Sequence, residues 1–288
     1  RRMVELVKSQ ICARDIMTEA AFENAIRVDM AMGGSTNTVL HIPAIAQESG
    51  IHISVEKFDD ISRETPNICS IIPAGPYEMW DIDEAGGIPS VLSRLTPLLH
   101  DTRTAEGLTL KQAAEQGRVR DDEKIRPLDR PYHAQGGIAV LKGNMAHSAV
   151  IKQTAVEETM LIHSGPAKVF FSEADLLDAL DARGIEDGDV VVLPYQGPAG
   201  APGMPEMLTP TDAIKGAGYR RVALITDGRF SGATTGPCIG HVEMEAYNGG
   251  PIGAIRDGDV IEMDIPNRRL NVRLTPEEIR ERLKDTHP

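Results

Sequence analysis

The clearest pattern in this chain is a series of short apolar runs in its second half. β-branched runs bounded mainly by Gly, Asn or Pro occupy positions 137–141, 148–152, 167–171, 189–193 and 222–225. Similar runs occupy positions 251–255, 260–265 and 270–274. Such runs predict β-strands, and the pair Asn267-Arg268 predicts a hairpin. Only three helices are expected among them, beginning at Ser172, Thr209 and Thr275. The pattern therefore predicts a β-rich, barrel-like domain.

The first half of the chain has helical periodicity instead. Val4, Leu6, Val7 and Ile11 recur at helical spacing, and Thr18 is a good N-cap for a second helix. Further helices are predicted over 39–50, 55–63, 81–95 and 108–114, with strand-like runs at 50–53 and 68–73. Pro43 should kink or interrupt its helix.

Residues 100–133 are polar and charged, which favours a domain boundary. We therefore predict an α/β (α+β) chain. Residues 1–120 would form part of a helix-rich α/β domain, and residues 121–288 the β-rich domain.

Composition narrows the classes of partner. The chain has 30 basic and 43 acidic residues, a net charge of −13, which argues against nucleic acid or an anionic membrane surface as a partner. It has no apolar run near 18 residues, so no membrane span is expected. Three widely spaced cysteines and no signal peptide favour a reducing, cytoplasmic location. The chain opens on Arg1-Arg2 as if inside a helix, so we expect a fragment.

The most promising candidate for a site is the stretch from Gly203 to Gly240. It contains Glu206 between Pro and Met residues, then a buried run, then a loop that carries Asp227, Arg229 and Ser231 among glycines. Glycines permit close backbone approach, and N–H groups in such loops converge on anions. An ordinary strand-to-loop connection explains the same residues, and the pattern alone does not decide between the two.

Two other polar stretches have structural explanations beside functional ones. Gly33-Gly34-Ser35-Thr36-Asn37 precedes a helix, where N–H groups and hydroxyls can hold a carboxylate or phosphate, although capping alone explains Ser35 or Asn37. The acidic cluster of Asp81, Asp83 and Glu84 is more typical of a helix start than of a metal site. The lone Trp80 beside it is expected to pack.

Several long motifs resemble one family. They are Gly-Met-Pro-Glu-Met (203–207), Thr-Asp-Gly-Arg-Phe-Ser-Gly (226–232), Gly-His-Val (240–242) and Gly-Gly-Ser-Thr-Asn (33–37). Together they resemble the C-terminal half of the dihydroxy-acid and sugar-acid (phosphogluconate) dehydratases. The resemblance implies a hydro-lyase that converts a small-molecule 2,3-dihydroxy acid to a 2-oxo acid. It also implies Mg²⁺, a [2Fe–2S] or [4Fe–4S] cluster, and a homodimer or higher homo-oligomer.

The resemblance carries roles to particular residues. It implies that Glu206 is a Mg²⁺ ligand and that Ser231 is the base, acting as an alkoxide. It also implies a substrate-binding set of Ser35, Thr36, Asn37, Arg229 and Gly232. An alkoxide needs nearby positive charge and N–H donors, and Gly228 and Gly232 suit such a nest.

The remaining ligands are expected elsewhere. In the family, the cluster cysteines and the other Mg²⁺ ligands, including a modified lysine, lie in the N-terminal half, which is expected upstream of where this chain begins. Cys12, Cys69 and Cys238 are therefore assigned to no cluster, and Cys238 is expected to pack under the Ser231 loop. The isolated chain is expected to be inactive.

One departure from the family bears on substrate. Residues 240–246 read Gly-His-Val-Glu-Met-Glu-Ala, where the family usually has Gly-His-Val-Ser-Pro-Glu-Ala. The general resemblance along residues 30–50 and 249–267, and not this departure, favours a branched-chain substrate of the 2,3-dihydroxy-isovalerate type over sugar acids or phosphogluconate. A non-catalytic assembly module is the alternative from another class, and His241 is interpreted as structural.

Overall fold

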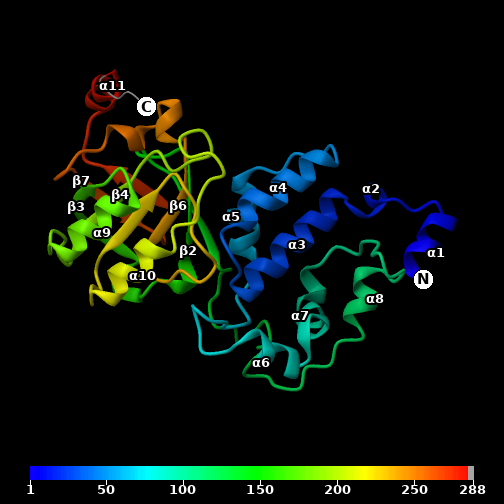
Figure 1. The fold of residues 1–288 in the computed structure, drawn as a ribbon. Coiled ribbons are helices and arrows are strands. Elements are labelled where there is room, and N and C mark those ends of the chain that lie inside the picture. Colours follow the sequence, from blue (N-terminus) through cyan, green and yellow to red (C-terminus); the bar gives the residue numbers. More distant parts are fainter. Residues whose placement is uncertain (285–288) are drawn as a thin grey trace. The chain divides into compact units, whose positions relative to one another are not determined.

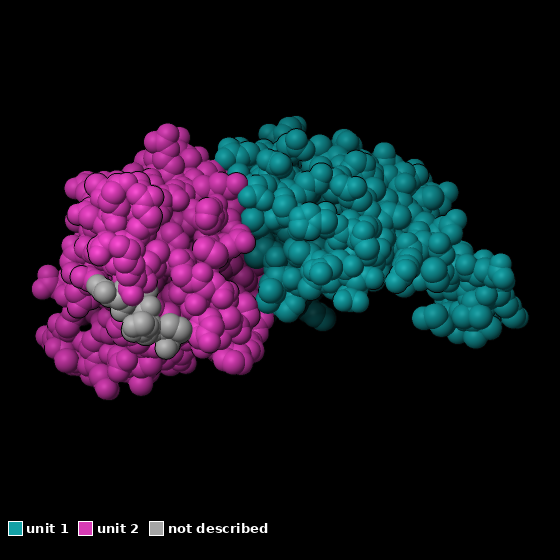
Figure 2. Space-filling model, turned by 90° about the horizontal axis from the view of Figure 1, so that it is seen from above, with its two compact units in different colours: residues 1–34, 38–137 teal, residues 35–37, 138–288 magenta. Residues whose placement is uncertain are grey.

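The computed structural model describes residues 1–284, which form two compact units (Figures 1 and 2). The first unit comprises residues 1–34 and 38–137, and the second comprises residues 35–37 and the chain from Ile138 onward. Residues 121–137 belong to the first unit because they pair with it: Arg126 N–H donates to Ile68 O at 2.9 Å, and Tyr132 N–H donates to Asn67 O at 2.8 Å. The contacts therefore divide the chain at 137, whereas the sequence suggested 120.

All regular elements described in the first unit are helices. They are α1 (Arg2–Lys8), α2 (Ala13–Ile16), α3 (Glu19–Met32), α4 (Thr38–Glu48), α5 (Val55–Glu64), α6 (Met79–Glu84), α7 (Gly87–Leu95), η1 (Thr96–Leu98) and α8 (Leu110–Ala114). Thr18 caps α3 as predicted, accepting from Ala21 N–H. A core that includes Ile68, Ile82 and Leu95 joins α3, α6 and α7 to the segments between them. Trp80 was expected to pack, but it is 68% exposed.

Two local predictions for this unit are wrong. The run 68–73 forms no strand, because Ile68 and Cys69 donate their N–H groups to Ala31 O at the end of α3 instead of to a strand. Residues 50–53 are also irregular, and Ile51 N–H caps α4 by donating to Ala46 O. Of the two effects predicted for Pro43, the interruption does not occur, because α4 continues to Glu48, and the kink stays a prediction.

The second unit is built on one mixed, eight-stranded sheet that is nearly closed. Its strands are β1 (Ile138–Leu141), β2 (Ser148–Lys152), β3 (Ile162–Val169), β4 (Val190–Leu193), β5 (Ala223–Thr226), β6 (Cys238–Glu243), β7 (Val260–Asp264) and β8 (Arg269–Val272). The spatial order is β1-β2-β6-β5-β4-β3-β7-β8. Lys142, just after β1, exchanges backbone hydrogen bonds with Arg268 and Leu270, both 2.9 Å, so the two edges meet. The barrel-like prediction is confirmed.

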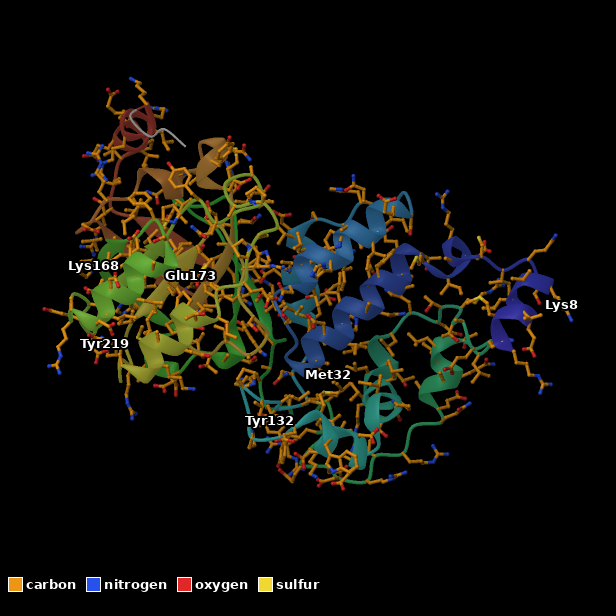
Figure 3. The ribbon with its side chains drawn as sticks, in the orientation of Figure 1. Lys8, Met32, Tyr132, Lys168, Glu173 and Tyr219 are labelled. Carbon is orange, nitrogen blue, oxygen red and sulfur yellow. The ribbon has the colours of Figure 1, made fainter. Side chains whose placement is uncertain are left out.

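Strands β3, β4, β5 and β6 are parallel neighbours, and helices provide two of the crossovers. α9 (Glu173–Asp181) connects β3 to β4, and α10 (Thr209–Gly216) lies between β4 and β5. The two helices pack side by side over these strands (Figures 1 and 3). Parallel strands need such crossovers because the end of one strand and the start of the next lie at opposite ends of the sheet.

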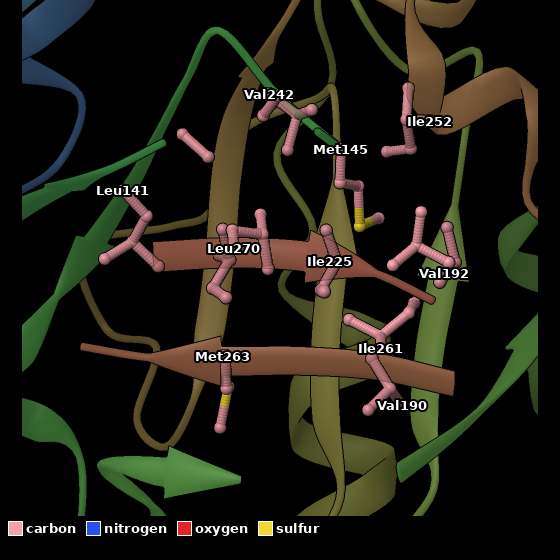
Figure 4. Close-up of a cluster of buried hydrophobic side chains, with 14 of the residues drawn as sticks. Leu141, Met145, Val190, Val192, Ile225, Val242, Ile252, Ile261, Met263 and Leu270 are labelled. Carbon is pink, nitrogen blue, oxygen red and sulfur yellow. The ribbon is translucent and has the colours of Figure 1, made fainter. Parts of the chain in front are cut away.

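Alternate side chains of the central strands enter two different cores. Val190, Val192 and Ile225 face the barrel interior with Leu141, Ile261 and Leu270 (Figure 4). Val191, Leu193 and Leu224 face α9 and α10. Burial on both faces explains why these strands appear in the sequence as continuous apolar runs.

The segments after β6 follow the pattern with one exception. The hairpin around Asn267-Arg268 joins β7 and β8 as predicted. Residues 251–255 were expected to be a strand but form the 3-10 turn η5 (Pro251–Ala254), after η4 (Ala246–Asn248). The remaining helical elements of this unit are η2 (Gln153–Ala155), η3 (Glu158–Met160) and α11 (Pro276–Lys284). No helix within residues 1–284 has the length and apolar character needed to cross a membrane.

Candidate functional site

Three loops of the second unit begin at the same edge of the sheet. They follow β4 (194–208), β5 (227–237) and β6 (244–250), and these strands are parallel. The carboxyl ends of parallel strands are where open α/β sheets bind ligands, because loops from several strands converge there. Glu206 lies on the first loop, and Arg229, Ser231 and Gly232 lie on the second.

Asp227 fixes the positions of all three loops. The residue is 2% exposed, and its carboxylate accepts from Gln196 N–H at 2.7 Å, Ala246 N–H at 2.8 Å and Tyr195 N–H at 3.1 Å. Burial raises the pKa of this carboxyl, and the three N–H donors oppose that shift. Asp227 is thus a buried anchor at the base of the Ser231 loop.

The third loop supports the first through a second carboxylate. Glu245 accepts from Ala199 N–H at 3.1 Å and Gly200 N–H at 3.2 Å, and Asn248 Nδ2 donates to it at 2.9 Å. Glycine is required where this carboxylate crosses the chain, because a Cβ at Gly197 would lie 2.2 Å from Glu245 Oε2. The loop that carries Glu206 is therefore held at both its start and its middle.

Glu206 and Arg229 bring the first two loops into register. They form an isolated parallel bridge, and Met207 N–H donates to Arg229 O at 2.8 Å. Arg229 Nε also donates to Met204 O at 2.7 Å, so its guanidinium braces the Glu206 loop. Glu206 itself is exposed, so its carboxylate can meet a ligand.

Residues 35–37 complete this region, since they belong to the second unit. Asn37 Nδ2 donates to Glu206 Oε1 at 3.1 Å and to Phe230 O, next to Ser231, at 3.2 Å. Asn37 N–H donates to Ser35 Oγ at 3.2 Å. The turn therefore joins the Glu206 loop to the Ser231 loop. It brings four of the seven candidate residues into one network, Ser35, Asn37, Glu206 and Arg229, and this network ends at Phe230, next to Ser231.

Ser231 itself lines a small pocket. Ser35, Thr36 and Gly232 line it too, whereas Asn37 and Arg229, which were also expected to bind substrate, do not line it. Arg229 instead braces the Glu206 loop. Ala233 N–H approaches Ser231 Oγ at 3.5 Å, a long contact of the kind seen in serine turns. The expected nest is corrected at Gly228, whose N–H donates to Thr226 Oγ1 at 3.0 Å. Gly228 instead permits close packing, because a Cβ there would lie 2.8 Å from Gln196 Cβ.

The sequence interpretation missed part of this pocket wall. Lys152 and Thr234 also line it, beside Cys238, which was expected to pack under this loop. Lys152 ends β2 and Cys238 begins β6, which pair antiparallel through Ile151 and Ile239. Because β6 was not predicted, nothing in the sequence indicated the strand pairing that places Lys152 at this pocket. Desolvation raises the pKa of the Cys238 thiol to about 12, so it is not a ready thiolate.

The residues fit one of the two implied cofactors. Mg²⁺ prefers hard oxygen ligands and is commonly held by one or two carboxylates, with waters and substrate oxygens completing its shell. The exposed Glu206 carboxylate is such a ligand. Among residues 1–284 no three His, Cys, Asp or Glu side chains are grouped for a metal, so Glu206 would be one ligand of a larger set.

The cysteines of this chain do not fit an iron–sulfur cluster. Clusters are held by several thiolates together, whereas Cys12 and Cys69 lie in the first unit and Cys238 in the second. Burial also raises the pKa of the Cys69 thiol to about 12. No step of the chemistry below is assigned to a cluster.

The acidic cluster of the first unit has a structural explanation. Asp81 Oδ2 accepts from Glu78 N–H at 2.9 Å at the start of α6, and Lys124 Nζ donates to Asp81 Oδ1 at 2.8 Å. The prediction of a helix start is confirmed for Asp81, whereas Asp83 and Glu84 are the last two residues of α6.

The fold defines a two-unit α/β protein with polar side chains gathered where parallel strands end. Family models then match nearly the whole chain. The model described as "Dihydroxy-acid/6-phosphogluconate dehydratase N-terminal" matches residues 1–113, and its C-terminal counterpart matches residues 123–288. The chain belongs to the dihydroxy-acid/6-phosphogluconate dehydratase family.

Individual relatives agree with this placement. The chain is 52% identical over 287 residues to a dihydroxy-acid dehydratase of Methanothermobacter thermautotrophicus, covering 99% of this chain and 52% of the relative. It is 54% identical over 283 residues to the enzyme of the same name from Archaeoglobus fulgidus, covering 98% of this chain and 52% of the relative. The chain thus spans about half the length of the curated relatives it matches.

Proposed function

We propose that this chain forms part of a hydro-lyase that dehydrates 2,3-dihydroxy acids, with Ser231 as the base and Glu206 as a Mg²⁺ ligand. The observation that carries the proposal is the pairing of the Glu206 and Ser231 loops through Arg229 and Asn37. Family membership supports the reaction class, and the single, exposed carboxylate of the site, a hard oxygen ligand, supports a hydrated Mg²⁺ over a closed metal cage.

The proposed reaction needs a base at one carbon and a departing hydroxide at the next. Ser231 Oγ, as an alkoxide, takes the proton from C2 of the substrate. The C–H electrons form the C2=C3 double bond, and the hydroxyl leaves C3 as hydroxide, which takes up a proton to become water. The resulting enol then loses the proton of its C2 hydroxyl and gains one at C3 to become the 2-oxo acid. When bound, Mg²⁺ would supply positive charge that stabilises both the enolate and the alkoxide.

The chain contributes the placement of these groups. Asp227 and Arg229 hold the Ser231 and Glu206 loops, so the base is positioned by a buried carboxylate and by backbone pairing. Ala233 N–H is the donor nearest Ser231 Oγ and would contribute to alkoxide stabilisation if its 3.5 Å contact shortens on binding.

A branched-chain substrate of the 2,3-dihydroxy-isovalerate type is our choice within the class. The two relatives described above are called dihydroxy-acid dehydratases. A panel that compares this acid with gluconate and 6-phosphogluconate tests the choice. A higher kcat/KM for either sugar acid would overturn it.

The metal role is tested by Glu206→Gln in the full-length gene product, reconstituted anaerobically with iron, sulfide and Mg²⁺. We expect turnover to fall at least about 100-fold and the Mg²⁺ concentration for half-maximal activity to rise, because one anionic ligand is lost. The matched control is Glu186→Gln, an exposed glutamate in the loop before β4. An unchanged Mg²⁺ dependence in Glu206→Gln would remove this residue from the metal site.

A further inference from the structure

The side chain of Asn37 has one half that is fully engaged and one half that is not. Its Nδ2 donates to Glu206 Oε1 and Phe230 O, at 3.1 and 3.2 Å. Its Oδ1 is buried, and none of the described residues donates a hydrogen bond to it. A buried carbonyl without a donor is costly, so such groups in native proteins usually have a partner in the working state.

The orientation of this amide is fixed by its surroundings. Amide oxygen and nitrogen are assigned from the hydrogen-bond network. Both groups beside Nδ2 are acceptors, a carboxylate and a backbone carbonyl. Turning the amide over would place Oδ1 against two other oxygens and lose both bonds. The acceptor of Asn37 must therefore face away from them.

Asn144 shows what a purely structural asparagine looks like in the same unit. Its Nδ2 donates to Val272 O at 2.8 Å and Leu274 O at 3.2 Å, and its Oδ1 accepts from Val272 N–H at 2.8 Å. Every polar atom of that side chain has a protein partner. The contrast indicates that Asn37 Oδ1 is kept for a group that the protein itself does not supply.

We infer that Asn37 Oδ1 accepts a hydrogen bond from an O–H group of the ligand bound beside Glu206. The inference rests on the proposed function for the chemistry of that ligand. Two sources supply the same O–H group: a water bound to Mg²⁺, or a hydroxyl of the dihydroxy acid. In either case Asn37 Oδ1 accepts a hydrogen bond from the ligand, while Asn37 Nδ2 donates one to the Glu206 carboxylate.

The direct test follows the side-chain carbonyl of Asn37 by NMR. Protein labelled with ¹³C and ¹⁵N at asparagine is titrated with Mg²⁺ alone and then with 2,3-dihydroxy-isovalerate. The Asn37 Cγ resonance, assigned with Asn37→Ala, should move downfield on binding, because its oxygen gains a donor. Asn144 Cγ should stay in place. Binding that leaves Asn37 Cγ unmoved in both titrations would overturn the inference.

Thermal stabilisation by the same ligands gives a second readout. Asn37→Ala should weaken binding by about three- to tenfold, the effect of one hydrogen bond, and reduce the ligand-induced rise in Tm. Asn144→Ala should lower Tm without ligand and keep the full rise. A loss with Mg²⁺ alone identifies the metal-bound water, and a loss confined to the dihydroxy acid identifies its hydroxyl.

The outcomes separate this inference from the proposed function. A full ligand-induced rise in Tm for Asn37→Ala would contradict only the role of Asn37. No stabilisation of the unmodified protein by either ligand would contradict both. Turnover that persists in Ser231→Ala would contradict the proposed base alone, since these titrations need no turnover.

Discussion

Removing the Asp227 carboxylate should destabilise the second unit more than any exposed acidic substitution. Asp227→Ala leaves the N–H groups of Tyr195, Gln196 and Ala246 without their acceptor. Each buried donor left unsatisfied costs about 1–3 kcal/mol, and relaxation recovers part of that. We expect a loss of about 3 kcal/mol in the free energy of unfolding. Asp227→Asn should cost about 1–2 kcal/mol, because one amide oxygen still accepts.

Urea unfolding, followed by circular dichroism, measures this loss. With a slope of about 3 kcal/mol per molar or less, a 3 kcal/mol loss lowers the midpoint by about 1 M or more. The control is Asp178→Ala, an exposed position in α9, which should stay within about 0.5 kcal/mol of the unmodified protein. A midpoint for Asp227→Ala equal to that of the control would refute the anchoring role of the carboxylate.

Two further predictions concern titratable groups. The thiols of Cys69 and Cys238 have a pKa of about 12, so at pH 8 each is ionised in roughly one molecule in ten thousand. Iodoacetamide should therefore label exposed Cys12 and spare the other two cysteines until the protein unfolds, as measured by mass spectrometry. Rapid labelling of Cys238 in the folded protein would contradict its desolvation. Burial alone would raise the pKa of Glu23, but hydrogen bonds from Lys57 and His100 outweigh it and lower the pKa below 4.5. The stability that the ionised Glu23 carboxylate contributes is therefore present above pH 4.5 and lost as pH falls through the lowered pKa. The difference in the free energy of unfolding between the unmodified protein and Glu23→Gln should shrink over that range. A constant difference would contradict the coupling of Glu23 to Lys57 and His100.

Much of the second unit could be predicted from the sequence, and the exceptions have a physical cause. Strands buried on both faces, such as β4 and β5, are continuous apolar runs and easy to find. β6 contains Gly240 and His241, which interrupt the apolar pattern, and His241 has a φ of 51°, which few non-glycine residues adopt in a strand. The strand exists because its neighbours β2 and β5 pair with it, and this is a tertiary effect.

The candidate site divides in the same way. Glu206, Arg229 and Ser231 lie in motifs that the sequence displays, so they could be singled out before the fold was known. The joining role of Asn37 and the anchoring role of Asp227 depend on contacts between segments far apart in the chain, 169 residues in the case of Asn37 and Glu206. No local pattern specifies which backbone N–H groups a buried carboxylate will meet.

The central claim is that the hydroxyl of Ser231 removes the C2 proton of a dihydroxy acid. The most direct measurement compares Ser231→Ala with Ser164→Ala, an exposed serine on β3, in the reconstituted full-length gene product. We predict that Ser231→Ala lowers kcat at least about 100-fold, as expected for loss of a general base, with Tm unchanged and Ser164→Ala fully active. A kcat for Ser231→Ala within about threefold of the control would contradict the account.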